Sequence, residues 1–364
     1  MINKLCCSTI MILVSMACQN QHTIKFDKLE LHKITKDQFK SLGTLSGTPI
    51  PIDATFNPSH IYHFNGRIFL VDIDHTAGML RIYDDSILVS ERIPQGAGPH
   101  ELPDIWNIQQ ITPDSFMFYS LYGRKIIPYN YPKDTLYSGI KINLLAFDNP
   151  IVFGTTLWVT SGNPEPGCKS SRFSQCDLSG NYITQFGELP VLDTTLSPEA
   201  YGEAFMVKHD YDPNSQSVVL GYVYTDFLEI YQMNGEVATR LFGPDYFTPV
   251  LRPRHYATNA SSYRMVVRPV IDETRYATKD LKIAKHKIFW LYDGRFIFQR
   301  GKTRSELDDN CTDLYLMDLQ GSPWYHLKLD PPLFTFAIAE DSNTQYGLSS
   351  VNDIGLFKYA LPEF

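Results

Sequence analysis

Short runs of β-type residues, separated by turn residues, fill the chain from about residue 56 to its end. This pattern limits the possible folds more than any other feature of the sequence. Runs rich in β-branched and aromatic residues are typical of strands; examples are Arg67–Asp72, Ser115–Tyr119, Thr156–Thr160, Ser217–Tyr222 and Lys287–Tyr292. Sustained helical periodicity is scarce. We therefore expect an all-β protein.

A repeated turn gives the period of the pattern. Strand-like runs end in a polar residue and a glycine turn at Gly180, Gly235 and Gly321, where a tight hairpin requires a positive φ. The first two glycines are 55 residues apart and the last two are 86 apart, or about 43 per repeat if one further copy lies between them. Periods of about 40–50 residues with four strands each indicate the blades of a β-propeller.

The count predicts six four-stranded antiparallel blades near residues 58–105, 106–142, 143–195, 201–247, 250–322 and 323–364. The domain division is then a signal peptide at 1–17, a tether with a ring-closing strand at 18–55, and the propeller at 56–364. We expect Leu29–Ile34 to pair with the last blade, because a closed ring leaves few exposed strand edges. Two stacked β-sandwich domains are the alternative, but no linker or shift in composition divides the chain.

The first residues have the features of a secretory signal. One lysine, Lys4, precedes an apolar stretch of about a dozen residues, which is too short to span a bilayer. The end of this stretch resembles the lipobox of bacterial lipoproteins, with Val14, Ala17 and Cys18 matching and Ser15 departing from the usual leucine. The resemblance implies that Cys18 is lipidated and becomes the new N-terminus. An ordinary signal peptide cut nearby is the alternative.

By the same resemblance, the residue after the cysteine bears on location. Gln19, in place of aspartate, argues against retention in the inner membrane, and acidic residues typical of surface-exported lipoproteins do not follow. We therefore expect an outer-membrane lipoprotein that faces the periplasm.

Three cysteines remain beyond Cys18, an odd number for an oxidising compartment. Cys168 and Cys176 are eight residues apart, which is about 26 Å along one extended strand, against an upper limit of about 7 Å between the Cα atoms of a disulfide. A bridge between them requires the chain at Cys168 to fold back over the strand that holds Cys176. Free or differently paired thiols are the alternative.

The segment Pro94–Leu102 contains Gly96, Gly98, Pro99, His100 and Glu101. It resembles the G-x-G-P-x-E-[FL] signature of the TolB-like six-bladed propeller lipoproteins of Bacteroidetes, a group with no assigned function. His100 departs from the glycine that is usual before the glutamate. Two more segments are similar to sequence segments of that family: Ile288–Gly294, and the stretch Phe336–Tyr359 near the end of the chain. The resemblance covers the chain from about residue 55 onward and implies a six-bladed propeller.

Two roles are open for this motif. The glycines and Pro99 restrict the backbone to a tight turn, which fits a crossover between blades in which Glu101 accepts backbone N–H groups. The functional alternative is that Glu101 and His100 contact a ligand or a cation at the mouth of the central channel.

The charge distribution points to partners. Thirty-two basic against forty acidic residues give a net charge of −8, so we expect no nucleic-acid partner. Between Arg252 and Lys287, however, nine basic residues face only three acidic ones. This segment is either a solvated outer face of one blade or a basic patch for an anionic partner. Arg264 and Arg268 are the candidate contacts.

No motif of catalysis appears: the sequence lacks a G-x-S-x-G elbow, an HExxH or CxxC zinc motif and a phosphate loop. We expect a non-enzymatic cell-envelope lipoprotein, held to the membrane by its lipid and without a cofactor. Its propeller would be a binding or scaffold module for a glycan, a peptide or a partner protein. The alternative, by resemblance to other six-bladed propellers, is a calcium-dependent lactonase-like or esterase-like hydrolase, with Glu101, Asp104, Asn107 and Asp226 as candidate ligands.

Overall fold

The structure is a computed structural model that describes most of the chain. The described residues are 24–25, 30–52, 57–73, 78–98, 100–141, 150–160, 171–192, 205–259, 262–297, 310–341, 343–351 and 353–363, and for 24–25, 191–192 and 253–266 they are described as backbone only. Cys18 and Pro99 therefore lie outside the described residues, as do the predicted signal peptide and Cys168.

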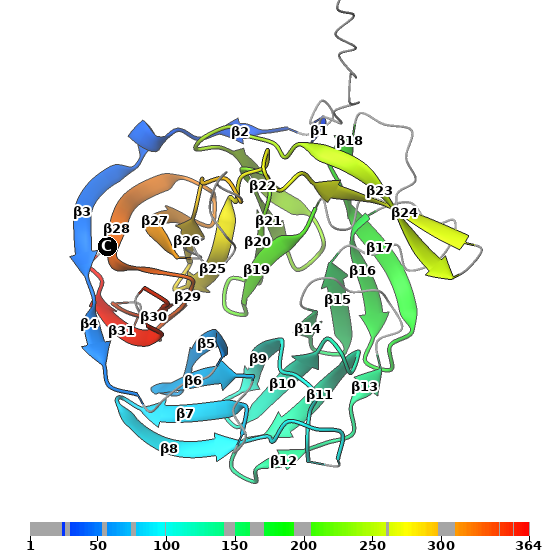
Figure 1. Ribbon diagram of the computed structural model, residues 1–364, viewed down its shortest axis with the longest axis vertical. Coiled ribbons are helices and arrows are strands. Elements are labelled where there is room, and N and C mark those ends of the chain that lie inside the picture. Colours follow the sequence, from blue (N-terminus) through cyan, green and yellow to red (C-terminus); the bar gives the residue numbers. More distant parts are fainter. Residues whose placement is uncertain are drawn as a thin grey trace, which may run out of the picture.

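Six sheets surround a central axis and form a closed ring (Figure 1). This arrangement confirms the prediction of an all-β, six-bladed propeller. Blade one consists of β5 (Pro58–Phe64), β6 (Arg67–Asp72), β7 (Leu80–Asp84) and β8 (Ile87–Arg92). Blade two consists of β9 (Asn107–Thr112), β10 (Ser115–Ser120), β11 (Lys125–Asn130) and β12 (Thr135–Leu136), and β13 (Ile140–Lys141) also pairs with β11. Blade three consists of β14 (Ile151–Phe153), β15 (Thr156–Thr160), β16 (Ser171–Asp177) and β17 (Tyr182–Glu188).

The other three blades each include a strand from the N-terminal segment. Blade four consists of β19 (Val207–Asp212), β20 (Ser217–Tyr222), β21 (Phe227–Gln232) and β22 (Val237–Phe242), with β2 (His32–Lys33) added. Blade five consists of β25 (Thr278–Ala284), β26 (Lys287–Tyr292), β27 (Cys311–Asp318) and β28 (Pro323–Leu333), with β3 (Lys40–Ser46) added. Blade six consists of β29 (Thr335–Ile338), β30 (Thr344–Ser349) and β31 (Gly355–Ala360), with β4 (Thr48–Ile50) added. Blades two, four and five thus have five strands rather than the predicted four.

The N-terminal segment follows the outer rim of the ring (Figure 1). After β1 (Ile24–Lys25), which pairs with β18 (Val191–Leu192), β2 and β3 add in parallel to the outer strands of blades four and five. A 3-10 turn, η1 (Lys36–Gln38), separates β2 from β3. The last blade is completed by β4, which pairs antiparallel with β31. An N-terminal strand therefore closes the ring, but it is Thr48–Ile50 and not the predicted Leu29–Ile34.

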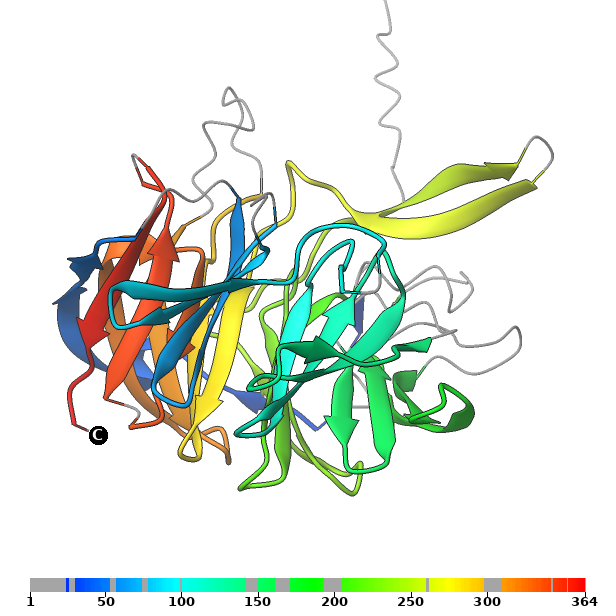
Figure 2. The same cartoon turned by 90° about the horizontal axis from the view of Figure 1, so that it is seen from below.

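Two predicted blade boundaries are wrong. The strand Pro323–Leu333 is the outer strand of blade five, so the last blade begins at Thr335 rather than at residue 323. The segment from Leu251 to Pro269 belongs to no blade. It forms the separate hairpin β23 (Leu251–Asn259) and β24 (Ser262–Pro269), called here the arm, which projects from the side of the ring (Figure 2).

The repeated glycine turns connect the third and fourth strands of blades three, four and five. Gly180, Gly235 and Gly321 have φ values of 82°, 88° and 81°, as the hairpin prediction requires. The wider spacing between the last two glycines does not hide a further blade, because the arm is inserted there.

The apolar core is divided into layers between blades. Six clusters of buried side chains in the described residues each join two neighbouring blades. Between blades four and five, for example, Val219 and Leu228 pack with Ile288 and Trp290. Each sheet buries both of its faces against its neighbours, which explains why the strands contain long apolar runs rather than strict alternation.

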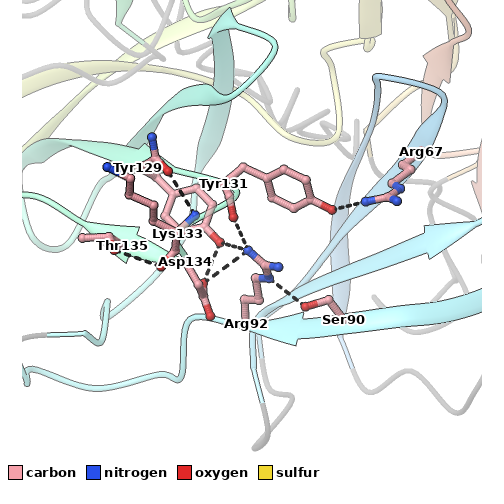
Figure 3. Close-up of polar contacts among 9 residues, drawn as sticks. Arg67, Ser90, Arg92, Tyr129, Tyr131, Lys133, Asp134 and Thr135 are labelled. Carbon is pink, nitrogen blue, oxygen red and sulfur yellow. Dashed lines mark hydrogen bonds and ion pairs between the residues drawn. The ribbon is translucent and has the colours of Figure 1, made fainter.

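Polar contacts reinforce the layers. Between blades one and two, Arg92 donates to the Tyr129 hydroxyl at 2.8 Å and to the Tyr131 carbonyl, and its guanidinium lies over the Tyr131 ring (Figure 3). The Tyr129 hydroxyl in turn donates to Asp134 at 2.7 Å. Arg67 donates to the Tyr131 hydroxyl from the other side (Figure 3). The outer strand of blade one is thereby fixed to blade two.

Candidate functional site

The glycine motif shapes the crossover from β8 to β9. The Gly98 N–H donates to the Glu101 carboxylate at 2.8 Å, and the Gly96 N–H donates to the Leu102 carbonyl at 2.9 Å. A Cβ atom at Gly96 would collide with the Glu101 carboxylate, so a larger residue there would have to displace this side chain from its bond to Gly98. This is the structural role that the sequence suggested for Glu101. Neither Glu101 nor the exposed His100 is among the residues that line the two cavities of the central channel.

The candidate anion contacts lie on the arm. Arg264 and Arg268 are both in β24, and Arg268 is opposite Arg252 in the register of the hairpin. The structure therefore separates these arginines from the blade on which the sequence placed them.

The cysteines of the described residues are buried. Cys176 and Cys311 are free thiols, and burial, with a smaller contribution from Asp177, raises the pKa of Cys176 to about 11. Cys168 lies outside the described residues, so its pairing with Cys176 stays a prediction.

Two of the residues proposed as calcium ligands, Asp104 and Asp226, instead accept hydrogen bonds from other groups of the protein. The Asp104 carboxylate accepts bonds from the Ser120 hydroxyl at 2.5 Å and from the Leu121 N–H at 2.8 Å. The Asp226 carboxylate accepts the N–H groups of Asp245 and Tyr246 at 2.5 and 2.7 Å. Within the described parts of the chain, no group of three or more histidine, cysteine or acidic residues is placed to hold a metal ion.

The central channel is bordered by the innermost strand of each blade, β5, β9, β14, β19, β25 and β29. The inner edge of such a strand exposes backbone groups that have no partner in their own sheet. Polar side chains bond to these groups across four of the junctions between neighbouring blades. The contacts are Tyr62 hydroxyl to Ile108 N–H at 3.2 Å, Gln109 amide to both backbone groups of Val152 at 2.8 Å, Asp210 to Ile283 N–H at 2.7 Å, and Asp280 to Phe336 N–H at 3.1 Å.

Two cavities of about 230 and 240 Å³ open into the channel and share His60, Lys208 and Asp280. The second cavity, called here the upper cavity, lies where the innermost strands begin. Its wall is formed by Ser59, His60, Trp106, Lys208, Val223, Tyr276, Thr278, Lys279, Asp280, Phe334 and Thr335.

Charges in the channel are arranged around Asp280. Its carboxylate accepts bonds from Lys282 Nζ at 3.0 Å and from the Thr335 hydroxyl at 2.7 Å, besides two backbone N–H groups. Burial alone would raise the pKa of Asp280, but the positive charges of Lys282 and Lys208 outweigh burial and lower it. The Asp280 carboxylate is therefore charged and fully used by the protein.

Burial dominates the pKa values of the other ionisable groups in the channel. Burial, together with the charges of Lys208 and Lys282, lowers the pKa of His60 to about 3, so its imidazole is neutral at pH 7. Burial raises the pKa of Asp210, farther down the channel, to about 6. In the upper cavity the charged groups are then Lys208, Lys279 and the saturated Asp280, which leaves a net positive wall.

Aromatic rings form the rest of this wall. Trp106 is 38% exposed, and its ring lies 6.1 Å from that of His60. Just before β25, Tyr276 stacks on Tyr224 with the ring centroids 5.7 Å apart. The Nζ atom of Lys279 lies 5.3 Å from the centroid of the Tyr276 ring. The upper cavity thus combines flat apolar surfaces with cations.

Sequence reasoning missed this site. Its charged residues belong to the runs Val207–Asp212 and Thr278–Ala284, in which charges occupy alternate positions: Lys208 with Asp210, and Asp280 with Lys282. In a strand such residues share one face. Paired charges on one face of the first strand of a blade are the signal that could have identified the channel.

Comparisons with known proteins agree with the fold. The family model described as TolB-like 6-blade propeller-like matches residues 56–341. Among solved structures, a member of the DUF4221 family from Bacteroides vulgatus is 9% identical, with a TM-score of 0.54 and coverage of 94% of this chain and 98% of that one. At this identity the likeness concerns the fold alone.

Two other solved structures are less similar. The β-propeller domain of Cps50 (Swd1) from Myceliophteria thermophila is 7% identical, with a TM-score of 0.44 and coverage of 87% of this chain and 100% of that one. The hydrazine synthase of Kuenenia stuttgartiensis is 10% identical, with a TM-score of 0.42 and coverage of 85% and 98%. No curated protein matches the sequence. The described part of the chain contains no helix with the length and apolarity of a membrane span.

Proposed function

Because the chain belongs to the TolB-like six-bladed propeller family, we propose that it is a non-enzymatic binding lipoprotein of the cell envelope. Its ligand is an acidic glycan, of which one charged sugar ring occupies the upper cavity. The observation that carries this proposal is the combination, in one cavity, of two lysines with exposed aromatic surface.

The chemistry of the wall favours an acidic sugar over a neutral ligand. Lys208 and Lys279 attract a carboxylate, while the saturated Asp280 cannot bind a cation without losing its four hydrogen bonds. Trp106 and Tyr276 offer rigid faces on which the apolar side of a sugar ring packs. A cavity of about 240 Å³ admits about one ring, so the rest of the glycan would lie outside the channel.

The proposal places the protein at the outer membrane, facing the periplasm, with a lipid on Cys18. The lipobox-like sequence before Cys18 and the glutamine after it support this location. Metabolic labelling with radioactive palmitate tests the lipid. Label should enter the wild-type chain and be absent from Cys18→Ser, and label retained in the variant would contradict the anchor.

Calorimetric titration with D-glucuronate tests the ligand class, with D-glucose as the uncharged comparison. We expect binding of glucuronate only. The variants Lys208→Gln and Lys279→Gln should each weaken binding about tenfold or more, because each removes a charge-assisted contact. Lys125→Gln, at an exposed position of blade two, is the matched control and should bind normally.

Four results would contradict this proposal. Equal binding of glucose would exclude charge recognition, and unaltered binding in both lysine variants would exclude the upper cavity. Binding of a short peptide with a free carboxylate, without binding of glucuronate, would assign the cavity to peptides. Stoichiometric calcium in the purified protein, measured by elemental analysis, would favour the hydrolase alternative.

A further inference from the structure

The rim of the ring between blades four and five carries a second group of aromatic and basic side chains beside the upper cavity. This rim consists of the segments 223–226 after β20, 243–250 after β22, 270–277 before β25 and 293–297 after β26. Because neighbouring strands of a blade run antiparallel, all four segments lie at the end of the channel where the innermost strands begin.

Backbone hydrogen bonds join these segments to one another. The Ala277 N–H donates to the Val223 carbonyl at 2.7 Å, which connects blade five to blade four. The Tyr276 N–H donates to the Arg295 carbonyl at 2.9 Å, which connects the start of β25 to the segment after β26. Side chains on such a frame are preorganised, so a ligand that binds to them loses less conformational entropy.

Arg275 is held on this frame by two aromatic rings. Its guanidinium carbon lies 5.6 Å from the centroid of the Phe247 ring and 4.9 Å from that of the Phe296 ring. Arg275 is half-buried, and Phe296 is 45% exposed. A contact of this kind attracts the positive charge of the guanidinium but gives its five N–H donors no oxygen to bond to.

The other charged residues of this rim are paired, whereas Arg275 is not. Arg252 pairs with Glu273 at 2.6 Å, and Arg295 pairs with Asp293 at 2.5 Å. Within the described residues, Arg275 has its two ring contacts and no carboxylate or carbonyl as a hydrogen-bond acceptor. Arg275 is therefore a positioned cation with free donors, which can bind a carboxylate through two parallel hydrogen bonds.

The group formed by Phe247, Arg275 and Phe296, called here the rim patch, continues the wall of the upper cavity. Tyr276, which lines that cavity, directly follows Arg275, and Arg275 and Phe296 are partners in an isolated antiparallel bridge. Neighbouring Cα atoms are about 3.8 Å apart and bridged ones about 5 Å apart, so Phe296 begins within about 10 Å of Tyr276. The next rings of a sugar chain can span this distance.

We propose that the rim patch is a second subsite for an acidic sugar, in which Arg275 binds the carboxylate of a ring beyond the one in the upper cavity. This inference rests on the proposed function and specifies its ligand as a linear oligosaccharide with repeated acidic rings. A ring that leaves the cavity over Tyr276 packs its apolar side on the exposed Phe296 and brings its carboxylate to the guanidinium.

A different route out of the cavity leads over blade two. Trp106 directly precedes β9, and the connection between β10 and β11 carries the exposed Tyr122 and Arg124. No described ring or carboxylate pairs with Arg124, so a ligand would have to order this side chain at a cost in entropy. Arg275 is already held in place, which favours the route over the rim patch.

Calorimetric titration of the full chain with D-glucuronate and with a linear tetramer of glucuronate tests the proposal. The wild-type protein should bind the tetramer about tenfold or more tightly than the monomer, which exceeds the gain of about fourfold that four equivalent rings give by statistics alone. The variant Arg275→Gln should bind the tetramer about tenfold more weakly than the wild type, because it lacks the charge-assisted contact. Its affinity for the monomer should be unchanged, which shows that the upper cavity is intact.

The matched control is Arg124→Gln, which makes the same change at the same end of the channel in blade two and should bind both ligands normally. Unchanged tetramer binding in Arg275→Gln would overturn the proposal, as would a loss in Arg124→Gln instead, which would place the sugar chain over blade two. Equal affinity of the wild type for tetramer and monomer would overturn this inference alone. Failure of the wild type to bind either ligand would refute the proposed function as well.

Discussion

Removal of the buried carboxylate of Glu229 should destabilise the protein strongly. Glu229 is fully buried on β21, between blades three and four. It pairs with Arg240 at 3.0 Å and with the fully buried Arg172 at 3.6 Å, and it accepts the Tyr222 hydroxyl at 2.8 Å. The substitution Glu229→Gln keeps the shape of the side chain but leaves two guanidinium groups without their anion.

The expected cost follows from the burial. Removing one partner of a buried ion pair costs about 3–5 kcal/mol, because the remaining charge stays away from water. With a urea dependence of about 3 kcal/mol per M for a protein of this size, the unfolding midpoint should fall by about 1–1.7 M. Glu236→Gln, on an exposed turn of the same blade, removes the same charge and should change stability by no more than about 0.5 kcal/mol.

Equilibrium unfolding in urea, followed by far-ultraviolet circular dichroism, measures both variants. Combining Glu229→Gln with Arg172→Met should restore part of the loss, with a coupling of about 1 kcal/mol or more between the two positions. A loss below about 1 kcal/mol for Glu229→Gln, or additive effects in the double variant, would refute the reasoning. It would mean that water reaches this network.

Three further predictions concern single residues. Burial raises the pKa of Asp226 to about 7, so the native state keeps a proton that the unfolded chain releases near pH 4. The free energy of unfolding should therefore fall by about 4 kcal/mol as the pH rises from about 4 to about 7. The variant Asp226→Asn should lack this pH dependence when its unfolding by urea is compared at pH 5 and pH 8. Gly96→Ala should lower the thermal midpoint, because the new Cβ displaces Glu101, whereas Gly66→Ala, which has open space but a positive φ, should cost only about 1 kcal/mol. A thiol reagent should label Cys176 and Cys311 only after unfolding, because both are buried, and rapid labelling of the native protein would contradict their placement.

Local patterns predicted the class and number of the blades well. The strand runs and the glycine turns depend on neighbouring residues alone, so Gly180, Gly235 and Gly321 could be placed correctly in hairpins. The blade boundaries were less predictable. The arm has the composition of two strands, and no feature of its sequence indicates that these strands lie outside the ring instead of forming part of a blade.

The candidate site was the least predictable part. Glu101 was noticed because it belongs to a compact motif, and the structure gives it a role within its own loop. Lys208, Lys279 and Trp106 come from three different blades and share no motif. Only closure of the ring brings them to one cavity, and each looks like an ordinary strand or turn residue in the sequence.

The sequence by itself determined the β class, the sixfold repetition, the turn positions and the excess of basic residues between Arg252 and Lys287, since these follow from the order of residues along the chain. The tertiary structure decided which N-terminal strand closes the ring, where the inserted hairpin projects and which side chains face the channel. The physical reason is that strand edges and channel walls are formed by pairing between distant segments. The free energy of such pairing depends on all the partners that compete for the same edge.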